Sequence, residues 1–274
     1  MPTLRERAEQ LAVRYLSPDL SKKLMALKAK LPVRLHQTAP VVQMYLNDAH
    51  TRSFVGLNNF FSFLRADVPT PARVQLTFHD PSGRVVLQHA LSLAHFAAQA
   101  VDVAAVFAAK KVSSPYGVVT VQMTPESPRR PVYRELGRVS AQFFVFFRDR
   151  EHGSVEQTHP LSTADPDNRP SPPFLSSQVI STAKLVEVNV FQYNPSTITH
   201  SLEHALVDIA TNAKVATQRH SIHSLGAARS VFRLADISPL PAHLTLAVDA
   251  LPSANSKPML RRVFAGGQHS MSHA

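Results

Sequence analysis

The stretch RVQLTFHDPSGRVVLQHALSL, residues 73–93, decides the fold class. It begins by alternating polar residues with the apolar residues Val74, Leu76 and Phe78, which is the period of a strand that buries one face. Asp80-Pro81-Ser82-Gly83 follows, with proline at the second position of a turn and glycine at the fourth. Apolar residues then return on one face as far as Leu93. This stretch therefore predicts a β-hairpin.

Further strands are expected on both sides of the hairpin. The patterns place them at Gln99 to Val103, at Gly117 to Met123 and at Val139 to Phe147. The last of these is apolar on both faces, which indicates a strand that is buried or paired at an interface. Several short strands with turn signals at this spacing are typical of a β-sandwich or barrel.

The same pattern returns after PLSTADPDNRPSPPF, residues 160–174, whose proline-rich and serine-rich composition is typical of a linker. Asn59 of NNFFSF matches Asn189 of VNVFQY, 130 positions later. The hairpin strand fits better one position further on, with a turn one residue shorter, and a one-residue slip would reverse its faces. In that alignment Val74, Leu76 and Phe78 match Ala205, Val207 and Ile209. Residues 118–123 match the strand from Leu244 to Val248.

The ends of the two copies also match. RRPVYRELG, residues 129–137, aligns with SKPMLRRVF, residues 256–264, which makes RVSAQFFVFF an insertion in the first copy. GSVEQTH, from Gly153, aligns with GQHSMSH, from Gly267. We therefore predict a mainly β chain with two tandem, internally duplicated antiparallel β-sandwich domains of immunoglobulin-like size. The predicted domains are residues 37–160 and 174–274, joined by a Pro/Ser-rich linker, residues 161–173.

An amphipathic helical arm is predicted for residues 1–36. Its second half carries an apolar stripe at helical spacing, opposite four lysines, formed by Leu20, Leu24, Leu27 and Leu31. Three interpretations stay open: a helical pair packed on its own protein, an arm that docks on a partner or membrane surface, and a targeting peptide. Glu6 and Glu9 argue against the last, because transit peptides are poor in acidic residues.

Composition limits the function classes. The 29 Lys and Arg residues outnumber the 19 Asp and Glu residues, so the formal net charge of +10 favours an acidic protein, a nucleic acid or an anionic surface as partner. The absence of cysteine excludes thiolate nucleophiles and cysteine metal sites. No apolar run is long enough to span a bilayer, and we expect a soluble protein of the cytoplasm or an organellar matrix.

No catalytic motif stands out, although the chain has 14 histidines. Three close histidine pairs are His200 with His204, His220 with His223, and His269 with His273. Strand residues four apart lie roughly 13 Å from each other, too far to share one metal ion, so neither a metal nor another cofactor is predicted. There is no G-x-S-x-G elbow and no phosphate-binding glycine loop.

The remaining candidates are basic clusters at matching ends of the two copies. Arginine suits carboxylate and phosphate recognition, so we predict partner-binding sites at Arg129, Arg130, Arg134, Lys257, Arg261 and Arg262, together with the four leucines of the arm. The sequence thus favours a non-enzymatic binding or assembly protein, a subunit or adaptor that joins a protein partner or another copy. A histidine-dependent metalloenzyme or hydrolase, and a nucleic-acid or anionic-surface binder, stay open as alternatives.

Overall fold

The computed structural model describes residue 20 and residues 32–33, 40–64, 69–126, 132–133, 143–158, 162–164 and 170–274. Within this part the chain is mainly β, as predicted. The predicted arm lies outside the described residues, except for an exposed Leu20. No helix in the described part is long and apolar enough to cross a membrane.

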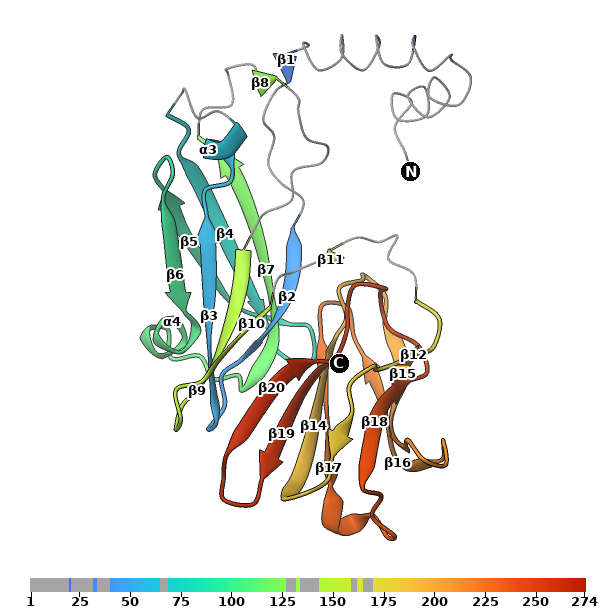
Figure 1. Cartoon of the computed structure of the whole chain (residues 1–274). Helices are drawn as coiled ribbons and strands as arrows, with labels where there is room; N and C mark the ends of the chain where they lie inside the picture. Colours follow the sequence, from blue (N-terminus) through green and yellow to red (C-terminus); the bar gives the residue numbers. More distant parts are fainter. Residues whose placement is uncertain are drawn as a thin grey trace.

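Two antiparallel sheets contain the N-terminal strands, which we call the first β unit (Figure 1). One sheet has the order β10-β9-β3-β6 and the other β11-β2-β7-β4-β5. The strands are β2 (Val41–Leu46), β3 (Thr51–Asn58), β4 (Ala72–His79), β5 (Val85–Leu93), β6 (Ala98–Asp102), β7 (Tyr116–Pro125), β9 (Phe143–Asp149), β10 (Val155–Thr158) and β11 (Ser162–Thr163). Two short helices, α3 (Phe61–Leu64) and α4 (Val103–Ala109), join strands, and β1 (Pro32–Val33) pairs with β8 (Val132–Tyr133).

Two further antiparallel sheets form the second β unit. Their orders are β12-β18-β15-β16, with β13 also on β18, and β17-β14-β19-β20. The elements are β12 (Phe174–Leu175), β13 (Ile180–Ser181), β14 (Leu185–Tyr193), β15 (His200–Asp208), β16 (Lys214–Ile222), β17 (Ala227–Arg233), the 3-10 helix η1 (Leu234–Asp236), β18 (His243–Val248), β19 (Met259–Phe264) and β20 (His269–His273).

The two units share one pattern of strand pairing. β3 lies between β6 and β9 as β14 lies between β17 and β19, and β4 lies between β5 and β7 as β15 lies between β16 and β18. The predicted hairpin is confirmed as β4 and β5. The predicted match between residues 118–123 and Leu244 to Val248 is also confirmed at the level of strands, because these residues belong to β7 and β18.

A buried asparagine occupies the same place in both units. The Asn59 side chain donates to the carbonyl oxygens of Thr70, Leu93 and Ala94, and its backbone N–H donates to Ala97. Asn194 repeats this arrangement with the carbonyls of Ile198, Ile222, His223 and Gly226. The equivalent of Asn59 is therefore Asn194, and the predicted match with Asn189 is wrong.

The predicted register of the repeated hairpin is also wrong. Both hairpins contain a register shift, between Phe78 and His79 in β4 and between Leu206 and Val207 in β15. Phe78 therefore corresponds to Leu206, and Leu76 to His204. The second turn, from Asp208 to Ala213, is one residue longer than the first, not shorter. Because the turns and loops differ in length, no single offset in residue number aligns the two units.

The ends of the units are aligned by a glycine that starts the last strand pair. Gly153 and Gly267 both have positive φ, at 71° and 84°, and precede β10 and β20, so this predicted match is confirmed. β19 corresponds to β9, because each pairs with the unit's central strand and with its last strand. RVSAQFFVFF therefore contains a shared strand and is not an insertion. Most of residues 129–137 lie outside the described part.

Candidate functional site

The two β units contact each other directly. β14 lies against β2, β17 against β7 and β20 against β10. Ala227 donates its backbone N–H to the Pro81 carbonyl at 3.0 Å, and the rings of Tyr116 and Phe191 meet edge to face at 5.9 Å. Phe191 also joins the hydrophobic core of the first unit, together with Tyr193, Ala227 and Met259. The hydrophobic core of the first unit therefore extends across the contact.

An ion pair lies inside this contact. Arg261 of β19 is 1% exposed and donates from Nη1 to Asp48 Oδ2 at 2.6 Å and to Thr51 Oγ1 at 3.3 Å. The guanidinium also stacks on the Phe191 ring, with its Cζ 5.2 Å from the ring centroid. Burial alone would raise the pKa of Asp48, but the Arg261 charge and hydrogen bonds outweigh burial and lower it. Arg261 and Asp48 therefore hold the units together as charged partners.

Two glycines allow the backbones of the units to approach closely. A Cβ added to Gly83, in the β4–β5 turn, would lie 2.1 Å from the Ser224 carbonyl oxygen. A Cβ added to Gly226, in the β16–β17 turn, would lie 2.7 Å from the Pro81 carbonyl oxygen. Separations this short exclude any side chain at either position in the present packing.

The predicted partner-binding residues have different surroundings. Arg129, Arg130, Arg134, Leu24, Leu27 and Leu31 lie outside the described residues. Lys257 is exposed. Arg262 is partly buried and donates to Ser272 Oγ and Gln178 Oε1 within its own unit. Arg261 lies in the contact between units, so it presents no charge to an outside partner while the units are docked.

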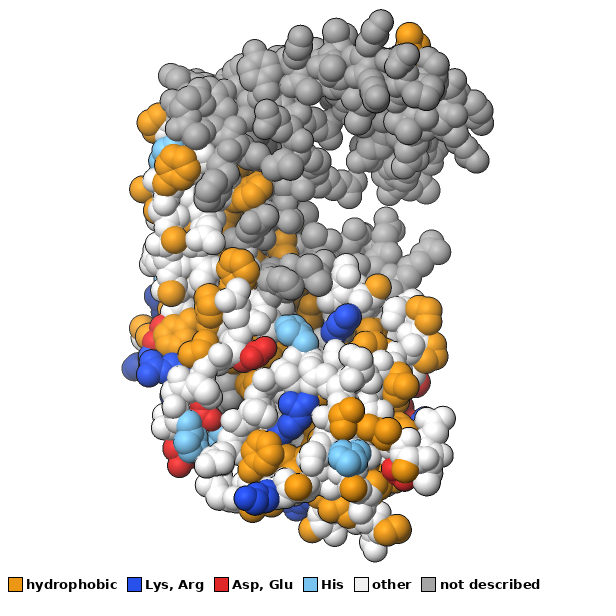
Figure 2. Space-filling model, in the orientation of Figure 1, with side chains coloured by type: hydrophobic (Ala, Val, Ile, Leu, Met, Phe, Trp, Pro, Cys, Tyr) orange, Lys and Arg blue, Asp and Glu red, His pale blue; other side chains and the backbone are white. Residues whose placement is uncertain are grey.

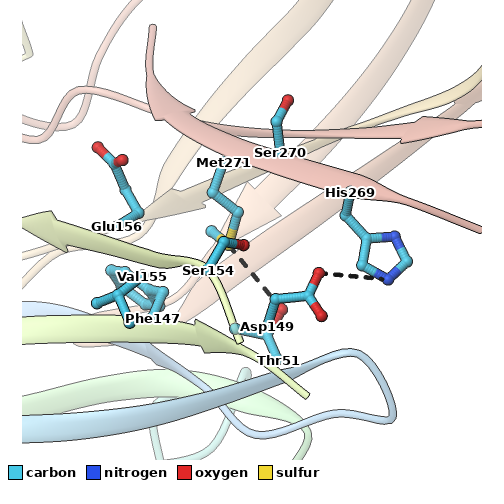
Figure 3. A pocket seen from close by; sticks show the side chains of 9 residues that line it. All are labelled: Thr51, Phe147, Asp149, Ser154, Val155, Glu156, His269, Ser270 and Met271. Atoms are coloured by element: carbon cyan, nitrogen blue, oxygen red, sulfur yellow. Dashed lines mark hydrogen bonds and ion pairs between the residues drawn. The ribbon is translucent and has the colours of Figure 1, made fainter. Parts of the chain in front are cut away.

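A cavity of about 200 Å³ lies next to Thr51, which accepts a hydrogen bond from Arg261, and Figure 3 shows the side chains of the residues that line this cavity. β9, β10 and the turn between them provide most of its wall, and β20 and the first residue of β3 provide the rest. The lining residues are Thr51, Phe147, Asp149, Ser154, Val155, Glu156, His269, Ser270 and Met271. Both β units therefore contribute to it.

Asp149 and His269 face each other across this cavity. Their side chains are 7% and 5% exposed, and Asp149 Oδ2 lies 3.9 Å from His269 Nε2. Burial raises the pKa of Asp149, but backbone N–H groups of His152 and Glu151 donate to its Oδ1 and the resulting pKa is below its usual value. Burial lowers the pKa of His269, and the opposite charge of Asp149 offsets this only in part. The structure therefore favours an ionised Asp149 beside a neutral imidazole.

The histidines gather across strands and not within the predicted pairs. His269 lies near His50, with 4.6 Å between ring centroids, and His204 lies 5.4 Å from His220. Ser230 Oγ bridges the latter two rings, at 2.8 Å from His204 Nδ1 and 2.6 Å from His220 Nε2. In the described part of the chain, no group of three or more histidine or carboxylate side chains is placed to hold a metal ion.

An aromatic surface covers the outer face of β3 and β9 in the first unit. Phe54, Phe144 and Phe146 are partly exposed there, and Figure 2 shows hydrophobic side chains gathered over these strands. The Phe146 ring lies over Gly56, where an added Cβ would meet it at 2.6 Å. We call these four residues the aromatic face.

The same face of the second unit is buried. In the first unit, Gly56 pairs with Phe144 and Phe54 with Phe146. At the equivalent positions of the second unit, Phe191 pairs with Met259 and Asn189 with Arg261. All four second-unit residues are buried, and three of them contact the first unit or join its core. The second unit therefore docks through the face that the first unit leaves partly open.

Sequence reasoning missed Asp48, Asp149 and the roles of the two glycines. One usable signal was the both-sided apolarity of β9, which indicated a strand at an interface. Asp48 gave no signal, because its partner lies in the last strands of the chain.

No family model matches the chain, and no curated protein matches it. A crystal structure of a glycosyl hydrolase family 2 member from Bacteroides cellulosilyticus is similar at 13% identity over 85% of this chain and 27% of that chain, with a TM-score of 0.19. A second structure of a family 2 member from this species gives 12% identity over 85% and 26%, with a TM-score of 0.19. This chain spans about a quarter of their length, and such TM-scores establish no common fold.

Proposed function

We propose that this chain is a non-enzymatic binding or assembly protein that docks a protein partner on its aromatic face. The observation that supports this is the contrast between the two units: the equivalent face of the second unit is already buried in a protein contact. We further infer that the units are two copies of one antiparallel β-sandwich, with the second serving as a platform for the first.

Aromatic side chains on a sheet face suit such docking, because they bury a large apolar area with little loss of side-chain freedom. The predicted basic contacts remain part of this proposal for an acidic partner, through Arg129, Arg130, Arg134 and exposed Lys257. Arg261 is left out, since a buried ion pair cannot serve as an exposed edge charge. The arm, with its leucine stripe, is proposed as a second docking element.

The proposal is tested by native purification of the full chain and of a Phe144→Gln/Phe146→Gln variant. We expect the wild-type chain to elute with a bound partner, or as an oligomer, and the variant to elute alone while keeping its melting temperature within a few degrees. Ile198→Gln is the matched control, because Ile198 is an exposed apolar residue of the second unit. Equal complexes from all three proteins would contradict docking on the aromatic face.

A further inference from the structure

The cavity between β9, β10 and β20 contains buried polar atoms without partners. Asp149 Oδ2, His269 Nδ1 and His269 Nε2 are buried and make no hydrogen bond to any residue that the structure describes. The 3.9 Å between the carboxylate and Nε2 is too long for a hydrogen bond between them. Buried polar groups are nearly always hydrogen-bonded, so three orphan atoms at one cavity indicate a missing polar partner.

The missing partner must donate hydrogen bonds. An ionised carboxylate oxygen only accepts, and a neutral imidazole has one accepting nitrogen and one donating nitrogen. Two of the three orphan atoms therefore need a donor. The hydroxyls of Ser154 and Thr51, which line the same cavity, can accept as well as donate.

The lining also carries negative charge. Asp149 and Glu156 contribute carboxylates, and none of the lining residues is Lys or Arg. Arg261 stands close enough to lower the pKa of His269, but Asp48 neutralises the guanidinium. An otherwise basic chain thus has a small acidic cavity, which favours a cation over a neutral or anionic ligand.

One side of the cavity is apolar, with Phe147 and Met271. We propose that the cavity binds the ammonium group of a small amine, which donates to Asp149 and His269 while its alkyl stem packs on these two side chains. This goes beyond the proposed function and does not depend on it, because the aromatic face lies on other residues. The site is complete only when the two units are docked.

The test uses n-butylammonium as the probe and n-butanol as its uncharged match. With methyl-labelled methionine in the full chain, the Met271 resonance is expected to shift saturably with the amine and to respond at least about tenfold more weakly to the alcohol. Glu156→Gln should weaken amine binding severalfold. Asp236→Asn, which removes the same charge from an exposed site in η1, should leave it unchanged.

Asp149 also stabilises its own turn, because its Oδ1 accepts from the backbone of Glu151 and His152. Two separate variants are therefore tested, Asp149→Asn and His269→Gln, and the second leaves that turn intact. Each is expected to lower the affinity at least about tenfold. The inference is overturned if the alcohol binds as tightly as the amine, if no saturable shift is seen, or if both variants bind normally. Tighter, stoichiometric binding of Zn²⁺ alone, or of inorganic phosphate, would also overturn it.

Discussion

Arg261 and Asp48 stand 213 positions apart in the chain and form a buried ion pair between the two β units, with 2.6 Å between Nη1 and Oδ2. Asp48 is held in turn by the backbone N–H groups of His50 and Thr51 at its other oxygen. The pair therefore joins the turn before β3 to the middle of β19. The Arg261 side chain is 1% exposed and the Asp48 side chain 14%, so both charges are largely withdrawn from water.

Removing one member of this pair should destabilise the chain more than removing both. We expect Arg261→Met to lower the free energy of unfolding by about 3–5 kcal/mol, because Asp48 is left without its counter-charge. Asp48→Asn keeps the side-chain shape and should cost a similar amount. Urea denaturation of both single variants and the double variant gives the coupling. If the loss of unfolding free energy in the double variant equalled the sum of the two single-variant losses, the pair would not join the units.

Gly83→Ala should weaken the contact between units specifically. Its φ is 84°, and the new Cβ would clash with the Ser224 carbonyl, a backbone atom that cannot rotate away. Gly267 has the same φ of 84° and no atom closer than 3.9 Å to an added Cβ, so Gly267→Ala controls for backbone strain alone. Thermal unfolding should show a clearly larger loss for Gly83→Ala. Equal losses would show that the units can separate slightly without cost.

His204 should make the fold sensitive to acid. Burial, and then the neighbouring His220, lower the pKa of His204 to about 3. The unfolded chain, with a histidine pKa of about 6.5, binds more protons below that pH, so stability is complete above pH 6.5 and declines towards pH 3. At about 1.4 kcal/mol per pKa unit, we expect a loss of about 3 kcal/mol between pH 7 and pH 4 from this residue.

His204→Leu is the matched variant for that prediction, since the first unit has Leu76 at the equivalent position. Ser230 keeps its hydrogen bond to His220 in this variant. Denaturation measured across this pH range should show a flatter profile than for the wild-type chain. An unchanged profile would assign the acid sensitivity to other groups.

Asn59→Ala and Asn194→Ala should have similar effects. Each substitution removes the side-chain donor from three backbone carbonyls, and the loss should be about 2–4 kcal/mol in each unit. Asn58→Ala is the control, because Asn58 is partly exposed at the end of the same strand. Chemical denaturation compares the three. A large effect at only one of the two buried positions would contradict their structural equivalence.

Limited proteolysis should cut between Pro160 and Phe174 and leave the fragments associated. β11 anchors the start of this segment to β2, while Ser171 donates to Leu251 and β12 pairs with β18. The fragments should co-elute in gel filtration, because the contact between units does not depend on the linker. Cleavage within residues 74–93 instead would argue against two separately folded units.

Local chemistry made the hairpin and the final turns predictable. Asp80-Pro81-Ser82-Gly83 specifies its turn by itself, and the Gly153 and Gly267 turns need positive φ whatever surrounds them. The predicted registers were wrong because they depend on loop lengths that differ between the two units. A better basis for aligning the two units would have been the asparagine that a serine closely follows, Asn59 with Ser62 and Asn194 with Ser196. Nothing local distinguishes buried Arg261 from neighbouring Arg262.

The close-approach glycines have a consequence for growth into filaments. Asn212, in the β15–β16 turn, is the second unit's equivalent of Gly83. Ala97, between β5 and β6, is the first unit's equivalent of Gly226. Both replacements carry the Cβ that the existing contact excludes. A second molecule that repeated this contact end to end would bring these two Cβ atoms to the positions where the existing contact leaves no room, which disfavours growth into an open polymer.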